Sequence, residues 1–407
     1  MFIFQTEQNA QNIKKNLTSS ECSGDYAFLR FELEQAAKVA LTLGPFSVTF
    51  SPTMAASGCA NDYFSMAPYA WQNPKAENPA TAPYIHRDGE RNPERLKYRQ
   101  KSDFSMLSHT LQTLGAAGYF LDRTDCIERA VELIRVWFVD EQTRMNPHLE
   151  YAQAVPNVTE GRGIGIIDLM ALNRVVYAAG YVNAAAGGIA GASTVMSGFD
   201  EWLGAMLEWL LNSKKGNDEA NNGNNHETFF NVHTGIYALR LGRKDVLDKV
   251  CDNYRTRILP RQVESDGSMP EELKRTISFT YCAYNSEAMA LLCEIGRAHG
   301  QDLWTFETDG RSLSKAIDFF LPTMINPYAK EALWKHPQIK DNSKLADRAF
   351  IQLAALRLGR KDLADLAAFL REDRRMWRQG NVAPLCLMEG YEFSTASDVF
   401  FTKENLL

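Results

Sequence analysis

Apolar residues recur at helical spacing through most of this 407-residue chain. Spacings of three and four residues place apolar side chains on one face of an α-helix, and the alternating patterns typical of strands are scarce. The spacing predicts helical runs at 28–43, 104–120, 126–138, 166–179, 202–211, 229–241, 246–258, 283–295, 313–321 and 345–370. We therefore expect an all-α protein.

One turn between these runs occurs twice. Residues 238–245 and 355–362 both read Ala-Leu-Arg-Leu-Gly-Arg-Lys-Asp, 117 positions apart. A glycine can end a helix in the left-handed conformation, and an Asp soon after it suits the start of the next helix. Gly118, followed by Asp125, is expected to act in the same way. Such turns join antiparallel helix hairpins, which build either an open superhelix or a ring. The irregular period favours the ring, an incomplete (α/α) toroid.

The segment 45–95 lacks the helical pattern and is rich in Pro, Asn, Tyr and Trp. Long segments of this kind are usually lids or binding loops. Tyr63, Tyr69 and Trp71 are candidate sugar-stacking side chains, because a flat ring covers the apolar face of a pyranose. The alternative is that they pack the loop onto the helices. We expect one catalytic domain over residues 1–407, with 45–95 as its lid region.

The charge distribution limits the partners. A formal net charge of −6 argues against nucleic-acid binding, which requires a dominant basic surface. Residues 86–101 nevertheless contain six basic and three acidic side chains, a local balance of +3. This segment, which includes Arg87, can attract an anionic ligand, although a solvated helix start would have the same composition.

Cysteine spacing and apolar runs give no sign of a metal or a membrane span. The seven cysteines form no CxxC and no zinc-like pattern, so we expect no metal and no other cofactor. One disulfide, between Cys22 and Cys59, is a possibility. The charge-free run 175–199 contains five glycines and a central Asn183, which disfavours membrane insertion.

The first residues lack the basic segment and long apolar run of a secretory signal. We expect a secreted or periplasmic protein whose leader is absent from this chain, with a cytoplasmic protein as the alternative. A monomer or a small homo-oligomer is expected.

Two segments about fifty residues apart combine the groups needed for acid–base chemistry. The first is Asn-Asn-His at 224–226, and the second contains Arg275 and Tyr281. Amide, imidazole and guanidinium groups can bind a carboxylate, and a phenol can transfer a proton. Because Arg275 and Tyr281 are six positions apart, they do not share one helix face. We expect Arg275 in a loop before a helix that begins near Ser278, with Tyr281 in its first turn.

Three motifs, in this order, resemble the alginate lyase family of α/α-toroid polysaccharide lyases. They are the loop with Asp-Tyr-Phe-Ser-Met-Ala-Pro-Tyr at 62–69 and Tyr-Ile-His-Arg-Asp-Gly-Glu-Arg-Asn-Pro-Glu at 84–94, Asn-Asn-His at 224–226, and the segment 266–281. The similarity covers about residues 45–340. It implies a metal-free β-elimination on a polyuronate, which leaves a 4,5-unsaturated sugar.

The resemblance also implies roles for single residues. Asn225, His226 and Arg275 would hold the uronate carboxylate, and Tyr281 would transfer the proton. Glu227 stands where the family often has Gly, which bears on the local subsite. Further candidates for substrate binding are Asn224, Tyr63, Tyr69, Trp71, Arg87, Tyr284, Trp334 and His336, with simple packing as the alternative for Tyr284 and Trp334.

The chemistry of the reaction fits these residue types. Removal of the C5 hydrogen places negative charge on the neighbouring carboxylate, so donors aimed there stabilise the transition state. Tyr has a pKa near ~10, and nearby cations must favour its phenolate if it is to act as a base. One phenol can serve both steps when C5–H and O4 lie on the same face of the sugar. Otherwise His226 is the expected base and Tyr281 the acid.

Alginate, especially its mannuronate-rich blocks, is the first expected substrate, and glucuronan is the alternative. A glycoside hydrolase on the same kind of toroid would need a pair of carboxylates, with Asp62, Asp88 and Glu227 as possible members, but no pair has a distinctive spacing. A non-catalytic solenoid scaffold would explain the hairpins but would not need Arg275 and Tyr281.

Overall fold

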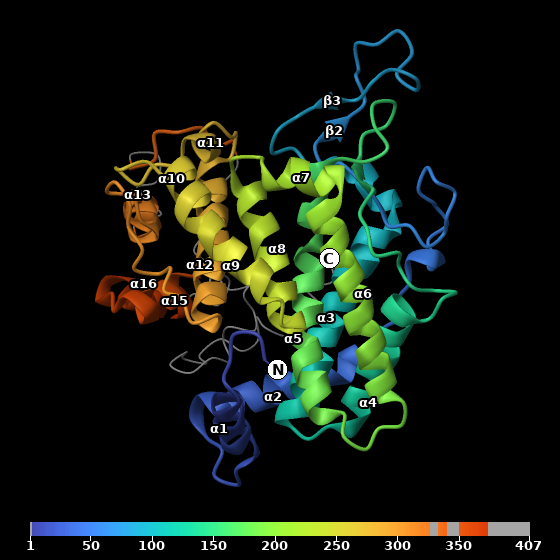
Figure 1. Cartoon of the computed structure of the whole chain (residues 1–407), viewed down its shortest axis with the longest axis vertical. Coiled ribbons are helices and arrows are strands. Elements are labelled where there is room, and N and C mark those ends of the chain that lie inside the picture. The colour runs from blue at the N-terminus through green and yellow to red at the C-terminus, as the bar shows by residue number, and fades with distance from the viewer. Residues whose placement is uncertain (1, 326–332, 340–349, 373–407) are drawn as a thin grey trace.

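The computed structural model describes residues 2–325, 333–339 and 350–372, and helices dominate it (Figure 1). The helices are α1 (Glu7–Thr18), α2 (Gly24–Ala40), α3 (Arg99–Phe120), α4 (Thr124–Ile134), α5 (Met170–Ala185), α6 (Ala192–Asn212), α7 (Lys214–Ala220), α8 (Asn225–Leu241), α9 (Lys244–Asn253), α10 (Leu259–Gln262), α11 (Pro270–Leu273), α12 (Ser278–Ala298), α13 (Leu313–Ile325), α15 (Phe350–Leu358) and α16 (Lys361–Glu372). The strands are β1 (Phe64–Met66), β2 (Ala70–Trp71), β3 (Ile85–His86) and β4 (Tyr151–Ala154).

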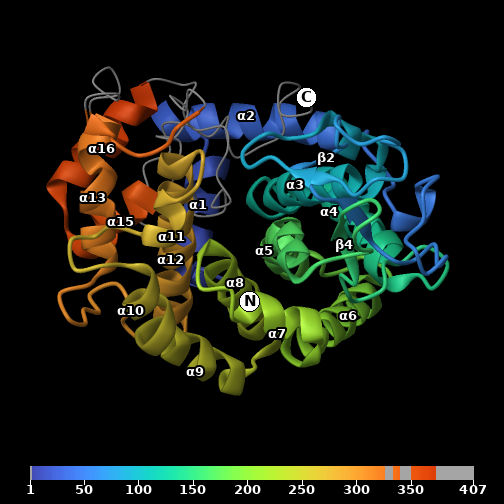
Figure 2. The same ribbon diagram turned by 90° about the horizontal axis from the view of Figure 1, so that it is seen from above.

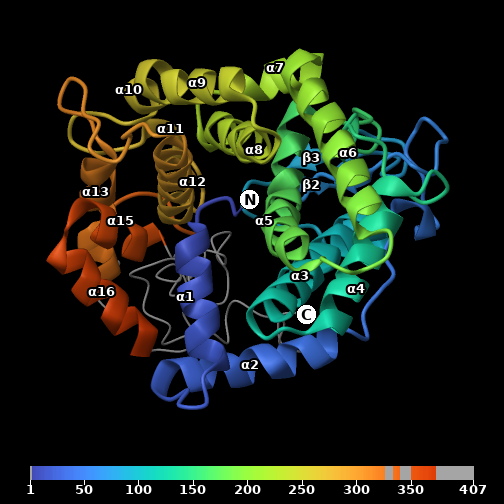
Figure 3. The ribbon, with the colours of Figure 1, turned by 60° about the horizontal axis from the view of Figure 1, so that its bottom comes forward.

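The helices form two layers of a ring. In Figures 2 and 3, α5, α8 and α12 lie inside the ring, with α6, α7, α9, α10 and α13 around them. Helix α3 packs against α5, and α8 packs against both α5 and α12. Helices α1 and α2 lie between α3 and the last helices of the described chain (Figure 3). The expected incomplete (α/α) toroid is confirmed.

Apolar stripes hold the layers together. On α4 the buried side chains are Cys126, Ile127, Ala130, Val131, Leu133 and Ile134, which follow the three-and-four spacing of one helix face. Gly118 does not end a helix as expected, because α3 continues to Phe120. A Cβ at Gly118 would lie 2.1 Å from Cδ1 of Ile127, so this glycine allows α4 to approach α3 closely.

The duplicated turn adopts the same conformation at both places. Gly242 and Gly359 are left-handed, with φ of 69° and 64°. In each copy the following arginine donates two hydrogen bonds to the aspartate two positions on, as Arg243 does to Asp245 and Arg360 does to Asp362.

A third copy of this turn precedes α4. There Asp122 takes the left-handed position with φ of 55°, and Arg123 donates to Asp125 at 2.8 and 2.6 Å. Asp tolerates this conformation better than most side chains, which explains why the sequence pattern pointed to the wrong residue.

The other differences from the expected helices have local causes. The run 345–370 is broken by Gly359 into α15 and α16, and residues 345–349 lie outside the described residues. Helices α1, α7, α10 and α11 were not predicted because they are short or largely polar. Helix α1 buries only Asn9, Ala10, Ile13 and Leu17.

Two small sheets involve the segment 45–95, and the strands of one, β2 and β3, lie at the top of Figure 1. Strand β1 pairs with β4 in parallel, and β2 pairs with β3 in antiparallel register. The buried carboxylate of Asp168 accepts hydrogen bonds from Tyr63 at 3.1 Å and from Ser65 of β1 at 2.6 Å. The side-chain amide of Asn92, which follows β3, donates to the backbone carbonyl of Ala70 in β2 at 2.8 Å. This hydrogen bond holds the end of the segment against β2.

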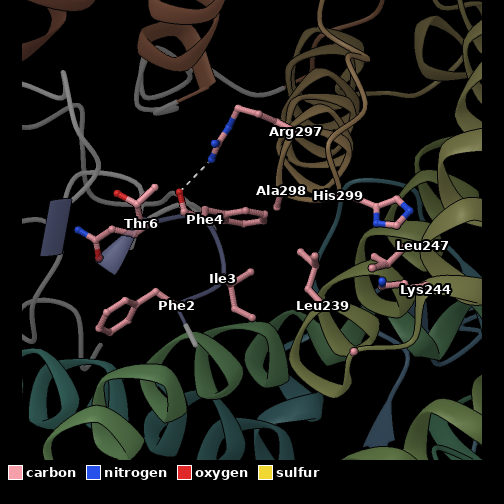
Figure 4. Close-up of a pocket in the computed structure, with 12 residues that line it drawn as sticks. Phe2, Ile3, Phe4, Thr6, Leu239, Lys244, Leu247, Arg297, Ala298 and His299 are labelled. Atoms are coloured by element: carbon pink, nitrogen blue, oxygen red, sulfur yellow. Dashed lines mark hydrogen bonds between the residues drawn. The ribbon is translucent and has the colours of Figure 1, made fainter. Parts of the chain in front are cut away.

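The opposite end of α8 and α12 lines a cavity of about 400 Å³ beside the N-terminal segment (Figure 4). Arg297, near the end of α12, donates to the carbonyl of Phe4 at 3.0 Å. Phe2 packs on Tyr119 of α3 and Tyr181 of α5, with ring centroids 5.2 and 5.1 Å apart. The segment therefore ties α12 to the first half of the ring.

Two further expectations concern single features. Cys22 and Cys59 are free, so they do not form the disulfide considered above. The segment Gly163–Ala185 is long and apolar enough to span a membrane, but 72% of its most apolar window is buried in the structure, as expected of a core helix.

The close approach of α6 and α7 predicts a stability change. A Cβ at Gly216 would lie 1.9 Å from the carbonyl oxygen of Leu210, which is backbone and cannot move aside. Gly216→Ala should lower the free energy of unfolding by at least about 2 kcal/mol, measured by chemical denaturation. Gly204→Ala is the matched control, because nothing lies within 4 Å of its Cβ position in α6. That variant should be neutral or more stable by up to about 1 kcal/mol. Equal stabilities of the two variants would contradict this packing.

Candidate active site

The two sequence segments that carry acid–base groups meet in the structure. Asn225 begins α8, and Tyr281 lies in the first turn of α12, whose start at Ser278 is where the sequence placed it. The two helices pack side by side, with the rings of Phe229 and Tyr284 4.4 Å apart. A buried carboxylate, that of Glu272 on α11, binds the start of α8.

Glu272 is 1% exposed, and its carboxylate accepts three hydrogen bonds from Asn225. The backbone N–H of Asn225 donates at 2.7 Å, and its side-chain amide donates at 3.0 and 2.8 Å to the two carboxylate oxygens. Burial raises the pKa of Glu272, while Asn225, Arg275 and His226 act in the opposite direction. The side chains of Arg275 and His226 therefore both lie near this carboxylate.

The start of α8 orients the ring of His226. Asn224 caps the helix, because its side-chain oxygen accepts from the N–H of His226 at 2.9 Å. Nδ1 of His226 lies 2.7 Å from Oε1 of Glu219, on α7. The side chain of His226 is 18% exposed, whereas that of Glu219 is 1% exposed. Nε2 is thus the nitrogen that remains for a ligand.

Arg275 and Tyr281 are in direct contact. Nη2 of Arg275 donates to the phenol oxygen at 2.6 Å, and the guanidinium carbon lies 3.6 Å from the centre of the Tyr281 ring. The hydroxyl of Tyr69, from the segment 45–95, lies 3.0 Å from that of Tyr281.

Asp88 holds Arg275 in this position. Its carboxylate receives Nη2 at 2.5 Å and Nε at 3.2 Å, and it accepts the N–H of Thr276 at 2.9 Å. Burial raises the pKa of Asp88, but these hydrogen bonds outweigh burial and lower the pKa to about 2. A negatively charged Asp88 therefore links the segment 45–95 to the loop before α12.

Tyr281 is a neutral phenol in this arrangement. Burial raises its pKa most, Tyr69 raises it further, and Arg275 opposes both. The sequence argument expected cations to dominate. Burial reverses the net direction, and because Tyr69 also raises the pKa of Tyr281, displacement of Tyr69 would favour the phenolate.

Several predicted substrate contacts have other partners. Tyr63 is fully buried and bonded to Asp168, so it offers no stacking surface. Asn225 is 1% exposed, and its side-chain amide donates to Glu272. This amide is therefore directed into the protein, whereas the sequence predicted that it would contact the substrate. Trp334 is 7% exposed and donates to Ser278 at 2.9 Å, which is the packing alternative.

The remaining candidates keep partial exposure. Tyr284 bonds to Sδ of Met170 at 2.7 Å and packs on α8. The guanidinium of Arg87 lies 4.9 Å from the centre of the Trp71 ring, and Trp71 donates to Glu90 at 2.9 Å. His336 is exposed and its ring is 5.2 Å from that of Trp334.

The three carboxylates considered for a hydrolase are already engaged. Asp62 accepts from Ser57 and Asn146, both at 2.6 Å, and lies 3.1 Å from His148. Glu227 pairs with Arg257 at 2.9 Å, and Asp88 pairs with Arg275. Each of the three carboxylates is thus paired with a basic side chain, and no two of them form the facing pair that a glycoside hydrolase would need.

The family model described as Alginate lyase matches residues 47–329, which is most of the chain. This chain belongs to the alginate lyase family. Among solved structures, an alginate lyase from Bacteroides ovatus is 29% identical with a TM-score of 0.85, covering 96% of this chain and 99% of that one.

More distant structures share the fold. Alginate lyase A1-III from Sphingomonas species A1 is 15% identical with a TM-score of 0.51, covering 87% of this chain and 88% of that one. A variant of alginate lyase A1-III complexed with a tetrasaccharide is also 15% identical, with a TM-score of 0.54 and 86% of each chain covered. No curated protein matches the sequence.

In this member of the alginate lyase family, sequence reasoning missed Glu219 and Glu272 and considered Asp88 only as a hydrolase carboxylate. Each acts through a partner that is distant in sequence or lies across a break between helices. Glu219 is seven positions before His226, but Gly223 with φ of 78° separates α7 from α8. The acidic residues of 266–275 gave no sign that Glu272 alone is buried.

The ion pair of Asp88 predicts a pH dependence of stability. The pKa of its carboxyl is about 2 in the folded chain and 3.8 as the ordinary value. A depressed folded-state pKa stabilises the fold above pH 3.8, and this contribution is lost as pH falls from 3.8 toward 2. At neutral pH, Asp88→Asn should lower the free energy of unfolding by about 1 to 2 kcal/mol after allowance for solvent screening.

The difference between wild type and Asp88→Asn should shrink as urea unfolding is repeated at decreasing pH. Glu90→Gln is the matched control, because this exposed carboxylate has only a 3.9 Å ion pair with Arg87. A constant difference across the acid range would show that the Asp88 charge does not stabilise the fold.

Proposed function

We propose that this enzyme cleaves alginate by β-elimination between the starts of α8 and α12. The observation that carries the proposal is the contact of Arg275 with the phenol oxygen of Tyr281 at 2.6 Å. The Bacteroides ovatus alginate lyase and the tetrasaccharide complex support a uronate polymer as the ligand.

The Arg275–Tyr281 contact suits a proton-transfer residue. In the reaction, the C5 proton is removed, a double bond forms between C4 and C5, and O4 leaves with a proton. Tyr281 passes through the phenolate form whether it first accepts the C5 proton or first protonates O4. A guanidinium donor at its oxygen stabilises that form in both cases.

His226 and Arg275 are the cations we assign to the uronate carboxylate. Asp88 occupies the Nε and Nη2 edge of Arg275, which leaves Nη1 for the substrate. Nε2 of His226 can donate to the carboxylate when the ring is protonated, or accept the C5 proton when it is neutral. The proposed reaction needs no metal ion, because these side chains neutralise the carboxylate.

We propose mannuronate-rich blocks as the preferred substrate and glucuronan as the alternative. Mannuronate and glucuronate differ at C2 but share the configuration at C4 and C5, where C5–H and O4 lie on the same face. A single phenol can therefore serve both sugars. Guluronate presents C5–H on the other face and would require a second group, such as His226, as the base.

Tyr281→Phe tests the reaction. The variant should lose at least about 10²-fold in kcat on mannuronan, because the acid–base group is removed while the ring remains. Activity is measured as ultraviolet absorbance of the conjugated double bond, which hydrolysis would not produce. Tyr119→Phe is the matched control, since that phenol lies among Phe2 and Tyr181 at the far end of α3.

Product profiles on mannuronan, guluronan and glucuronan, measured by mass spectrometry with the same variants, give the substrate preference. A wild-type enzyme that forms no unsaturated product on any of the three polymers, or a Tyr281→Phe variant with full activity, would refute the proposed function.

A further inference from the structure

A buried carboxylate on α7 contacts Nδ1 of the His226 ring. Glu219 is 1% exposed, and its Oε1 lies 2.7 Å from Nδ1 of His226. Its other oxygen, Oε2, accepts from the side-chain amide of Asn222 at 3.2 Å. These two contacts fix the carboxylate between the end of α7 and the start of α8.

A second cation lies near Glu219. Burial lowers the pKa of Arg162, and the charges of Asp168 and Glu219 act to raise it. Arg162 is itself held by Gln153, through Nε to the backbone carbonyl at 3.0 Å and through Nη2 to Oε1 at 3.1 Å. Arg162 is therefore a second basic side chain near Glu219, besides His226.

An ionised carboxylate can only accept hydrogen bonds. Nδ1 of a neutral His226 must then carry the hydrogen, and the lone pair lies on Nε2. If the ring is protonated instead, Nε2–H becomes a second donor, and Nδ1–H still donates to the carboxylate of Glu219. In both states the carboxylate determines which nitrogen meets the sugar, as in other carboxylate–histidine pairs.

We propose that Glu219 is a positioning residue that holds His226 in the Nδ1–H tautomer and directs Nε2 toward the substrate. The expected effect of Glu219 on turnover rests on the proposed function. The tautomer itself is a property of the free enzyme.

Two features of the local backbone hold Glu219 and His226 in position. Gly216, two positions after the start of α7, lets this short helix approach Leu210, and this packing places Glu219 under the start of α8. Asn224 fixes the first turn of α8 by accepting from the N–H of His226 at 2.9 Å. Ring and carboxylate are thus each held by their own helix.

The first experiment is nitrogen NMR of the full chain labelled with ¹⁵N-histidine, without substrate. The signals of His226 are assigned by their loss in His226→Gln. We expect hydrogen on Nδ1 and a lone pair on Nε2 when the ring is neutral. Hydrogen on Nε2 and a lone pair on Nδ1 of the neutral ring in the wild-type enzyme would overturn the proposal, whatever the activity of the enzyme.

The second experiment compares Glu219→Gln with Asp218→Asn. A glutamine amide has nearly the same shape but can donate to Nδ1, so the tautomers should mix and kcat should fall at least about tenfold. Asp218 is the matched control on the same helix, because its carboxylate is exposed and pairs with Lys214 at 2.7 Å. Asp218→Asn should keep wild-type kcat within about twofold.

The outcomes separate the two proposals. If the wild type forms no unsaturated product on any polyuronate, the proposed function fails, while the NMR result still decides the role of Glu219. A folded Glu219→Gln with the wild-type tautomer and unchanged kcat would reduce Glu219 to a structural residue and overturn the proposal. If Glu219→Gln does not fold, the wild-type spectrum alone gives the answer.

Discussion

The burial of carboxylates around the first turn of α8 is the interaction on which the site depends. A buried carboxylate is costly unless donors surround it, and here each one has them. Glu272 takes the backbone and side-chain donors of Asn225, and Glu219 takes Nδ1 of His226. Because neither carboxylate can leave its partner without a large penalty, the asparagine–histidine pair has little freedom to reorient. The amide that the sequence suggested as a substrate contact is instead part of the support.

The second half of the site is held by an ion pair between two segments that are distant in sequence. Asp88 lies in the segment 45–95, and it fixes Arg275 while Tyr69 lies against Tyr281. The same segment therefore supplies one interaction that keeps the guanidinium near the phenol and another that keeps the phenol neutral. Substrate entry and the ionisation of Tyr281 are thereby connected through one loop, since a sugar that displaces the Tyr69 hydroxyl removes one of the influences that raise the pKa of Tyr281.

Sequence reasoning was successful where the determinant is local. Apolar spacing identified the main helices, and the start of α12 at Ser278 placed Tyr281 correctly in a first turn. It failed where a side chain acts through a distant partner. Tyr63 resembled an exposed aromatic ring, but Asp168, 105 positions away, draws its hydroxyl into the core. Glu219 and Glu272 could not be distinguished from solvated acids, because burial depends on how α7, α8 and α11 meet, and no spacing in the sequence encodes that meeting.

The recurring arginine–aspartate turn has a consequence for how such a ring can grow. It precedes α4, α9 and α16, each time with a left-handed residue directly before the arginine. The left-handed residue and the arginine–aspartate hydrogen bonds all lie within the turn itself, so the conformation of the turn does not require a particular hairpin before it. Duplicating or exchanging a hairpin at such a junction would therefore preserve the angle between neighbouring modules, so that related chains could gain or lose circumference without redesign of the catalytic helices.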